Sequence, residues 1–263
     1  MTRALYSAAT GMQAQQLKID VIANNLANVN TDGYKQTRAE FQDLMYQTMR
    51  VSGAASSAST TTTVGLQVGL GVRPSATVRN FDGGTLKATG SNLDVAINGE
   101  GFLQIQLPTG EIAYTRNGSL HVNDEGRLTT SDGYLLEPPV TLPTNTNDDQ
   151  LTIGADGTIT VRSVDDNRST DLGRIRLARF VNKGGLEALG NNLYRSNGDT
   201  RSIREGYPTE DGFGSIQQGY LESSNVKVVE EMIAMITGQR AYEASSKVIQ
   251  AADRMLEQAN QLR

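Results

Sequence analysis

The chain has 263 residues, no cysteine, no tryptophan and a formal net charge of −5. The lack of cysteine excludes disulfides and thiolate chemistry, and the lack of a basic block argues against nucleic acid as a partner. No apolar run is long enough to span a membrane, and the first residues hold no apolar stretch of signal-peptide type. We expect one or two domains and, if the protein leaves the cytoplasm, a route without a cleaved signal peptide.

Residues 1 to about 30 have the periodicity of an amphipathic helix. Apolar residues recur every seven positions, with a second row beside them: Leu5, Met12, Ile19 and Leu26, then Ala8 and Ile22. This spacing is typical of a heptad stripe that packs against another helix. Thr2 is a candidate N-cap, and Gly11 costs about 1 kcal/mol relative to alanine, so packing must support it.

The last zone, from about 222 to 263, repeats the pattern at the other end of the chain. The apolar stripe again has a spacing of seven: Val228, Met235, Tyr242, Ile249 and Leu256. Ser223, Ser224 and Asn225 are candidate caps for the start of this helix. The two stripes can pack on each other within one chain or on neighbouring chains in an assembly. Two helices alone make only a thin core, which favours the assembly.

Four asparagines crowd the end of the first helix, in "VIANNLANVNTDGYK" at 21–35: Asn24, Asn25, Asn28 and Asn30. Asparagine is a poor helix-interior residue because its amide competes for backbone hydrogen bonds. Its amide can also bond buried backbone without bringing in a charge. We expect the helix to end here, with Asn30 or Gly33 supplying the positive φ that ends it.

The middle of the chain has the features of a β domain. Of the 27 glycines, 23 lie between Gly65 and Gly219. Three turn pairs separate alternating apolar and polar runs and predict hairpins: Asn98-Gly99, Asn117-Gly118 and Asp156-Gly157. The predicted fold class is α+β, with a discontinuous coiled-coil domain of the two terminal helices, a central antiparallel β domain and an extended linker.

Residues 46–63 are rich in small polar side chains and bury little, so alone they should form an extended loop. We predict an inner helical domain of residues 1–30 with 225–263. Residues 31–70 then form a connecting segment that contains this loop, and residues 71–224 form an outer β domain.

Catalytic chemistry finds little support. The single histidine, His121, has no nucleophile motif beside it, and one histidine without cysteine cannot form a His/Cys metal site. The glycine-rich stretch at 65–72 lacks the lysine ending of a phosphate loop. We expect no catalytic residue, no cofactor and no metal. A β-rich binding module with a helical dimerisation stalk is the alternative from another class, and a peptidoglycan-acting enzyme is the third.

Four stretches together resemble the axial proteins of the bacterial flagellum, the rod and hook family. They are the asparagine-rich segment, "DVAINGEGFLQI", "YTRNGSLHVNDEGRLTTSDGYLL" and "QGYLESSNVKVVEEMIAMITGQRAYEASSKVI". The resemblance spans nearly the whole chain in the family's order. Length and residues 46–63 are most like those of the subunits of the distal rod, with a proximal rod subunit as the alternative.

The resemblance implies a hollow, rigid shaft of helically stacked subunits that transmits torque and serves as an export channel. Implied partners are further copies of the chain, proximal rod proteins, the hook protein, the P-ring and L-ring proteins and the flagellar type III export apparatus. The expected subunit interface comprises Leu5, Met12, Ile19, Ile22, Asn24, Asn25, Leu26, Asn28, Asn30, Val228, Met235, Tyr242, Ile249 and Leu256. The expected rod-stiffening segment includes Tyr46, Gln47, Arg50, Ser52 and Thr63.

Overall fold

The computed structural model describes residues 2–51, 55–57, 60–61, 63–143, 150–162, 169–196 and 203–261. The chain forms two compact units, and each is described by itself. Unit 1 comprises residues 1–27, 37–80 and 227–263, and unit 2 comprises residues 28–36 and 81–226. Unit 1 contains the two terminal helices and unit 2 consists mainly of antiparallel strands, which confirms the predicted α+β class.

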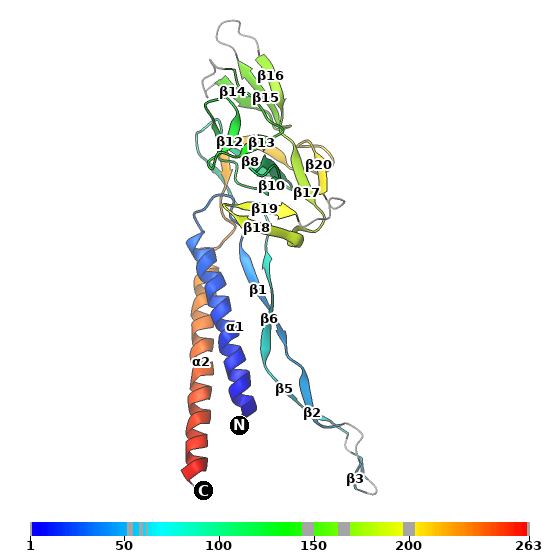
Figure 1. Ribbon diagram of the computed structural model, residues 1–263, viewed down its shortest axis with the longest axis vertical. Helices are drawn as coiled ribbons and strands as arrows, with labels where there is room; N and C mark the ends of the chain where they lie inside the picture. The colour runs from blue at the N-terminus through cyan, green and yellow to red at the C-terminus, as the bar shows by residue number, and fades with distance from the viewer. Residues whose placement is uncertain are drawn as a thin grey trace. The chain divides into compact units, whose positions relative to one another are not determined.

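The helices of unit 1 are α1 (Thr2–Ala27) and α2 (Val228–Gln261), and they run antiparallel side by side (Figure 1). Small residues allow them to approach closely. A Cβ added at Gly11 would lie 3.8 Å from Ser245 Oγ, and one added at Gly238 would lie 3.2 Å from Ile19 Cγ1. Packing against α2 therefore supports Gly11, as its place inside a helix required.

The ends of both helices differ from the prediction. Helix α1 ends at Ala27, and Gly33 adopts its positive φ of 72° six residues later, in the turn rather than at the helix end. Helix α2 begins only at Val228, so the cap prediction was wrong. Asn225 Oδ1 accepts from the Gln36 amide instead, at 2.7 Å, because a nearby backbone donor competes for the asparagine side chain.

A long β ribbon completes unit 1. Strand β1 (Thr37–Asp43) pairs with β6 (Val72–Arg79), and β2 (Tyr46–Arg50) with β5 (Leu66–Gly69), as one continuous arm (Figure 1). Strands β3 (Ala55–Ser57) and β4 (Thr60–Thr61) pair beyond them. Much of the predicted loop is therefore strand, because ladder hydrogen bonds between backbones do not require apolar side chains.

Unit 2 is built around a nine-stranded sheet. Its order is β11 (Leu120–Val122), β12 (Leu128–Thr130), β13 (Leu135–Glu137), β9 (Phe102–Gln106), β10 (Ile112–Thr115), β19 (Leu193–Ser196) and β18 (Leu186–Gly190), and β17 (Leu177–Phe180) joins β9 to β20 (Ile203–Gly206). A three-stranded sheet contains β14 (Leu151–Ile153), β15 (Thr158–Arg162) and β16 (Ser169–Arg174). A short 3-10 helix spans Lys183–Gly185.

Two further strand pairs close unit 2. They are β8 (Val95–Asn98) with β21 (Ser215–Gln218), and β7 (Leu86–Ala88) with β22 (Tyr220–Glu222). The hairpin at Asp156-Gly157 is confirmed by β14 and β15, whereas those at Asn98-Gly99 and Asn117-Gly118 are wrong. Tertiary packing assigns the strands beside these two pairs to other partners.

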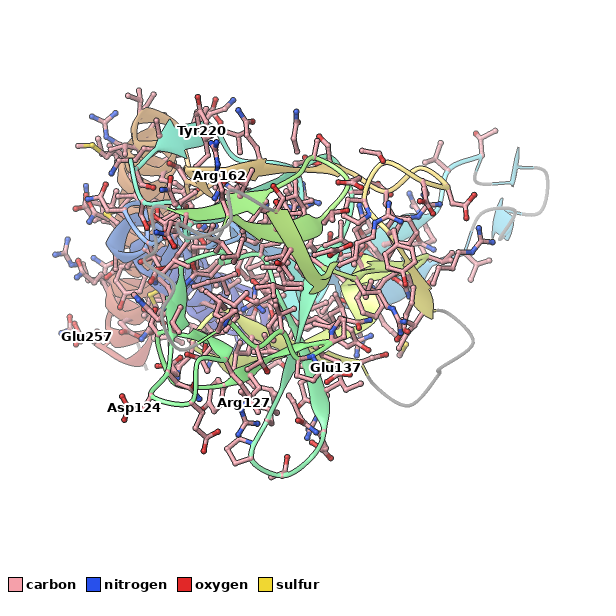
Figure 2. The ribbon with its side chains drawn as sticks, turned by 90° about the horizontal axis from the view of Figure 1, so that it is seen from above. Asp124, Arg127, Glu137, Arg162, Tyr220 and Glu257 are labelled. Carbon is pink, nitrogen blue, oxygen red and sulfur yellow. The ribbon has the colours of Figure 1, made fainter. Side chains whose placement is uncertain are left out.

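Apolar side chains fill the interior of unit 2. A large aliphatic cluster includes Ile105, Leu136, Ile159 and Leu177, none of which has measurable exposure. Beside it lie aromatic rings in edge-to-face contact, among them Phe102 and Phe180 at 5.5 Å. The turn between β11 and β12, which carries Asp124 and Arg127, lies at the surface of the unit (Figure 2).

Candidate functional site

Asn25, one of the four crowded asparagines, is buried within unit 1, with 1% of its surface exposed. Its Nδ2 donates to Thr37 O at 2.8 Å, and its Oδ1 accepts from Thr37 N at 2.9 Å. Nδ2 also lies 3.4 Å from the Glu231 carboxylate on α2. The amide thus pairs with strand β1 as a backbone residue would, and it ties α1, β1 and α2 together without adding a charge.

The other asparagines lie nearer the surface. Asn24 and Asn30 are exposed, and Asn28 is half-buried with its Oδ1 accepting from Thr31 Oγ1 at 3.2 Å. Asn24 lies on the last turns of α1, whereas Asn28 lies just beyond the helix end. Their contact with a second subunit stays a prediction.

The predicted apolar interface residues are unevenly covered. Ile22 is buried, whereas Val228 and Tyr242 are 39% and 40% exposed. The remaining members are half-buried: Leu5, Met12, Ile19, Leu26, Met235, Ile249 and Leu256. Their role between subunits stays a prediction, because the structure contains a single chain.

Helix α2 has one buried row, which includes small residues, and several exposed large apolar residues outside that row. The positions most buried along it are Glu231, Gly238 and Ala252, with the half-buried Ser245 in the same row. Large apolar side chains on other faces remain substantially exposed: Val229 at 69%, Met232 at 50%, Ile233 at 59%, Ile236 at 49%, Val248 at 49% and Met255 at 53%. A row of this size on one helix is typical of a surface that binds another protein.

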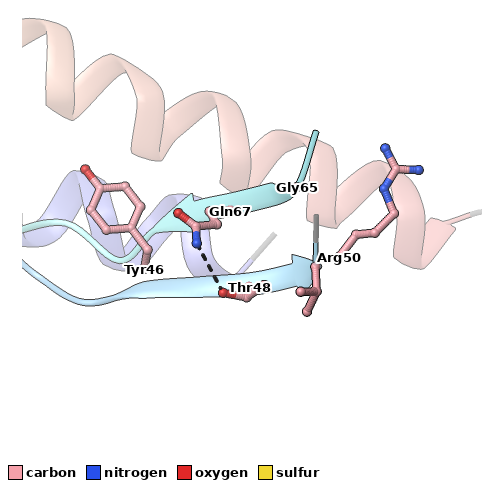
Figure 3. Close-up of a pocket in the computed structure, with 6 residues that line it drawn as sticks. Tyr46, Thr48, Arg50, Gly65 and Gln67 are labelled. Atoms are coloured by element: carbon pink, nitrogen blue, oxygen red, sulfur yellow. Dashed lines mark hydrogen bonds between the residues drawn. The ribbon is translucent and has the colours of Figure 1, made fainter. Parts of the chain in front are cut away.

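The segment predicted to stiffen the rod lies on the β arm. Tyr46, Gln47 and Arg50 are exposed on β2, Thr63 is exposed after β4, and Ser52 lies outside the described residues. A shallow hollow runs along this part of the arm, where Gln67 Nε2 donates to Thr48 Oγ1 at 3.5 Å (Figure 3). A hydrogen bond with Asp43 raises the pKa of the Tyr46 phenol.

Unit 2 contains a buried charge cluster of Lys35, Arg116 and Glu222, which the sequence analysis missed. Lys35 Nζ lies 2.6 Å from Glu222 Oε1, and Arg116 Nη1 lies 3.3 Å from Glu222 Oε2. Their side chains are 0%, 4% and 1% exposed, respectively. One carboxylate therefore pairs with two cations out of contact with water.

Burial dominates the electrostatics of this cluster. It lowers the pKa of Lys35 from its ordinary value of 10.5, although the Glu222 carboxylate acts in the opposite direction. Burial likewise lowers the pKa of the Arg116 guanidinium, again against Glu222. Taking charges out of water is unfavourable, and only close pairing with hydrogen bonds compensates for it.

The buried charge cluster also joins the segments where the chain enters and leaves unit 2. Gly33 N donates to Glu222 O at 2.7 Å, and Lys35 Nζ donates to Asp82 O at 2.7 Å. Asn225 Nδ2 donates to Asp82 O at 3.2 Å. The three stretches near residues 33–36, 82–84 and 222–225 are thus bonded to one another within unit 2.

Metal-ligating side chains do not gather into a cluster in the described part of the chain. No group of three or more metal-ligating side chains occurs there. His121 is exposed on β11, with its Nε2 3.4 Å from Ser131 Oγ. In the same residues, no helix is both long enough and apolar enough to cross a bilayer.

Comparison with known proteins identifies the family. The model "Flagella basal body rod protein" matches residues 5–35, "Flagellar hook protein FlgE/F/G D1 domain" matches 96–161, and "Flagellar basal body rod FlgEFG protein C-terminal" matches 217–262. The flagellar basal-body rod protein FlgG of Caulobacter vibrioides is 47% identical over 99% of both chains. That of Borreliella burgdorferi is 44% identical over 100% of this chain and 99% of its own. The chain belongs to the flagellar basal-body rod protein family.

Rod proteins of different types can be compared within one organism. The protein FlgF of Caulobacter vibrioides is 33% identical to this chain over 95% of it, against 47% for FlgG of that organism. The chain is therefore a structural subunit of the flagellar rod, in the basal body, and it resembles the FlgG type, that of the distal rod.

The buried charge cluster has a simple relation to the rod-protein family models. Lys35 lies in the first matched segment, Arg116 in the second and Glu222 in the third. The motifs that carry the resemblance, "DGYK", "YTRNG" and "YLESS", each supply one charge. The only sign of the cluster in the sequence was one charged residue in each of these motifs. No local pattern indicated that the three residues pair with one another.

Proposed function

We propose that copies of this chain polymerise helically into the distal part of the flagellar rod. The polymer is a hollow, rigid drive shaft that passes torque from the motor to the hook, and its channel carries exported proteins. The proposal rests on full-length similarity to proteins named FlgG and on one structural observation. Helix α1 covers the small-residue side of α2, while Val229, Met232 and Ile233 remain exposed.

Exposed apolar rows on a long helix favour association because burying them stabilises the complex by about 25 cal/mol per Å². In the proposed polymer, residues 1–30 and 225–263 line the inner wall and residues 71–224 form the outer wall, with 31–70 connecting them. The interface residues expected from the sequence, including Asn24 and Asn28, contact neighbouring copies there. The arm residues Tyr46, Gln47 and Arg50 brace adjacent subunits.

The proposed partners are other copies of the chain, proximal rod proteins, the hook protein and the P-ring and L-ring proteins that surround the rod. The shaft spans the periplasm, and the chain reaches it through the flagellar type III export apparatus without a cleaved signal peptide. The protein acts as neither an enzyme nor a nucleic-acid binder. Its residues serve packing and assembly. Its net charge of −5 does not favour binding to a polyanion such as nucleic acid.

Electron microscopy with helical averaging, on the concentrated full-length protein and on purified basal bodies, tests the proposal. A straight hollow tube with both terminal helices in its inner wall is the expected result. A discrete dimer at every concentration, absent from basal bodies, would instead favour a binding module, because two-fold interfaces close whereas head-to-tail interfaces propagate. Location of the chain in the proximal part alone would make it a proximal rod subunit.

A further inference from the structure

The order in which the members of the buried charge cluster occur along the chain is informative. Lys35 precedes Glu222 by 187 residues, and Arg116 precedes it by 106. A chain synthesised from its N-terminus therefore contains both cations before the carboxylate that pairs with them. Strand β22, which carries Glu222, also supplies the last of the sheet pairings in unit 2.

The other hydrogen-bond partners of the two cations are neutral. Lys35 Nζ donates to Asp82 O, and Arg116 donates to Ile97 O at 3.2 Å and Gly99 O at 2.7 Å. Carbonyl oxygens satisfy donors without neutralising charge. The carboxylates of Asp82 and Glu100 also favour the charged forms, but Glu222 is the strongest favourable influence on both cations.

Backbone packing around the cluster leaves little room for water. A Cβ at Gly84 would lie 1.9 Å from Ser223 O, and a Cβ at Gly33 would lie 2.7 Å from Asn117 N. Gly84 N donates to Glu222 Oε1 at 2.8 Å, so the same residue closes the backbone and neutralises the charges. Packing of the segment around Glu222 and Ser223 therefore completes the removal of both cations from solvent, and the same segment brings the carboxylate that pairs with them.

We propose that the buried charge cluster is a completion latch, which keeps unit 2 from closing stably until the chain through Glu222 is present. Burying an ion without a partner is strongly unfavourable. Two such penalties are comparable with the whole stability of a domain. A chain that ends before Glu222 lacks both this cover and the pairing carboxylate and thus stays open, which suits a subunit that passes through an export channel. That benefit rests on the proposed function, whereas the latch does not.

The first test is pulse proteolysis of the full-length protein in urea. Glu222→Gln keeps the shape of the side chain and removes its charge. Breaking a buried pair in this way costs about 3–5 kcal/mol, so the cleavable fraction of unit 2 should rise about a hundredfold or more. The matched control is Glu187→Gln, whose partner Arg195 lies 3.0 Å away in an exposed pair, and it should change that fraction less than about fivefold.

The second test separates charge from lost contacts. If uncompensated positive charge is the cause, adding Lys35→Met to the Glu222→Gln variant should stabilise it. The cleavable fraction of unit 2 should then fall about tenfold or more relative to Glu222→Gln alone. Independent losses would instead add, and a double variant less stable than Glu222→Gln alone would overturn the latch. Equal behaviour of Glu222→Gln and Glu187→Gln would overturn it as well.

The third test concerns order of events. During refolding of the full chain, pulse-labelling hydrogen exchange should protect amides of β9 and β10 no earlier than those of Gly33 and Gly84, whose acceptors belong to Glu222. Earlier protection of β9 and β10 would mean that the unit closes without the carboxylate. All three tests use the dissolved chain, so failure to form a rod would leave their outcomes interpretable.

Discussion

The two units of the molecule solve the problem of burial in opposite ways. Unit 2 buries most of its large apolar side chains, as with Ile105 and Leu177, and even encloses three charges. Unit 1 packs its helices through small residues and leaves Val229 and Ile233 exposed. Unit 2 thus completes its own core, whereas in the proposed polymer unit 1 is completed by other copies.

Glycines report the same difference. In unit 1, a Cβ at Gly11 would meet only an ordinary contact with Ser245, at 3.8 Å. In unit 2, a Cβ at Gly118 would lie 1.7 Å from Val95 O, a distance that no neighbour can accommodate without moving backbone. The helix pair therefore accommodates a methyl group at Gly11, whereas unit 2 does not accommodate one at Gly118.

Removing the exposed apolar row should have the largest effect. We expect Ile233→Ser with Ile236→Ser to abolish polymerisation while the monomer keeps its helix content and unit 2 stays folded. Both side chains are about half or more exposed, at 59% and 49%, so their loss costs the monomer little. Sedimentation and electron microscopy at a concentration where the unaltered protein polymerises provide the measurement.

The control for that variant is Gln239→Ser with Glu243→Ser, two exposed polar positions on the same helix. It costs at least as much helix propensity as the Ile233/Ile236 variant and should still polymerise. Normal tubes from the Ile233/Ile236 variant would mean that unit 1 is not completed through this row, and the comparison of the units would fail.

Substitution of Gly84 by alanine should strongly destabilise unit 2. Its Cβ would lie 1.9 Å from Ser223 O, and such overpacking should lower the free energy of unfolding of unit 2 by about 3 kcal/mol. The adjacent Gly83 is a matched control, because its Cβ would lie 3.9 Å from Glu222 Oε1. Urea unfolding of both variants decides the matter, and equal midpoints would show that unit 2 relaxes more easily than its packing indicates.

The sequence was sufficient for the helices and the fold class but not for which helix face turns inward. Both the large stripe through Met235 and the small one through Gly238 and Ser245 repeat every seven residues, so periodicity alone could not choose. Turn signals were similarly incomplete. Asp156-Gly157 forms its hairpin, whereas the strand before Asn98 pairs instead with β21, a partner far along the chain.

The buried charge cluster lay further beyond the reach of sequence reasoning. Lys35, Arg116 and Glu222 each have the appearance of a surface charge, because the partners that permit burial are separated by more than a hundred residues. Asn25 was recognised as unusual, but its bonds to Thr37 depend on where β1 returns beside the helix. Long-range pairing, rather than local pattern, decided these positions.

Gly11→Ala offers a smaller test of the tolerance of the helix pair. Alanine favours helix by about 1 kcal/mol over glycine, and the 3.8 Å separation from Ser245 Oγ accommodates the methyl group. We therefore expect thermal unfolding followed by circular dichroism to show α1 and α2 stabilised by up to that amount. Gly238→Ala should gain less, because its Cβ would lie 3.2 Å from Ile19. A destabilised Gly11→Ala protein would mean that the pair is as tightly packed as unit 2.

The smallest expected effect is a pH dependence of unit 2 that comes from Lys35. Burial lowers its pKa below 10.5 in the folded protein, against the opposing carboxylates of Glu222 and Asp82 and together with the charge of Arg116. Between that lowered pKa and 10.5 the unfolded chain binds more protons, so the free energy of unfolding should rise with pH across this window. Below the window Lys35 is charged in both states and the penalty is constant.

The Lys35 effect is best measured as the difference in urea midpoint between the unaltered protein and Lys35→Met, followed from neutral to alkaline pH. Tyrosines and other lysines titrate in both proteins and cancel in the difference, so the remaining slope belongs to residue 35. Midpoints that stay parallel at every pH would mean that Lys35 keeps its ordinary pKa. Burial in unit 2 would then not disfavour the charged form of Lys35 more than a surface position does. The contrast between the two units would rest on apolar packing alone.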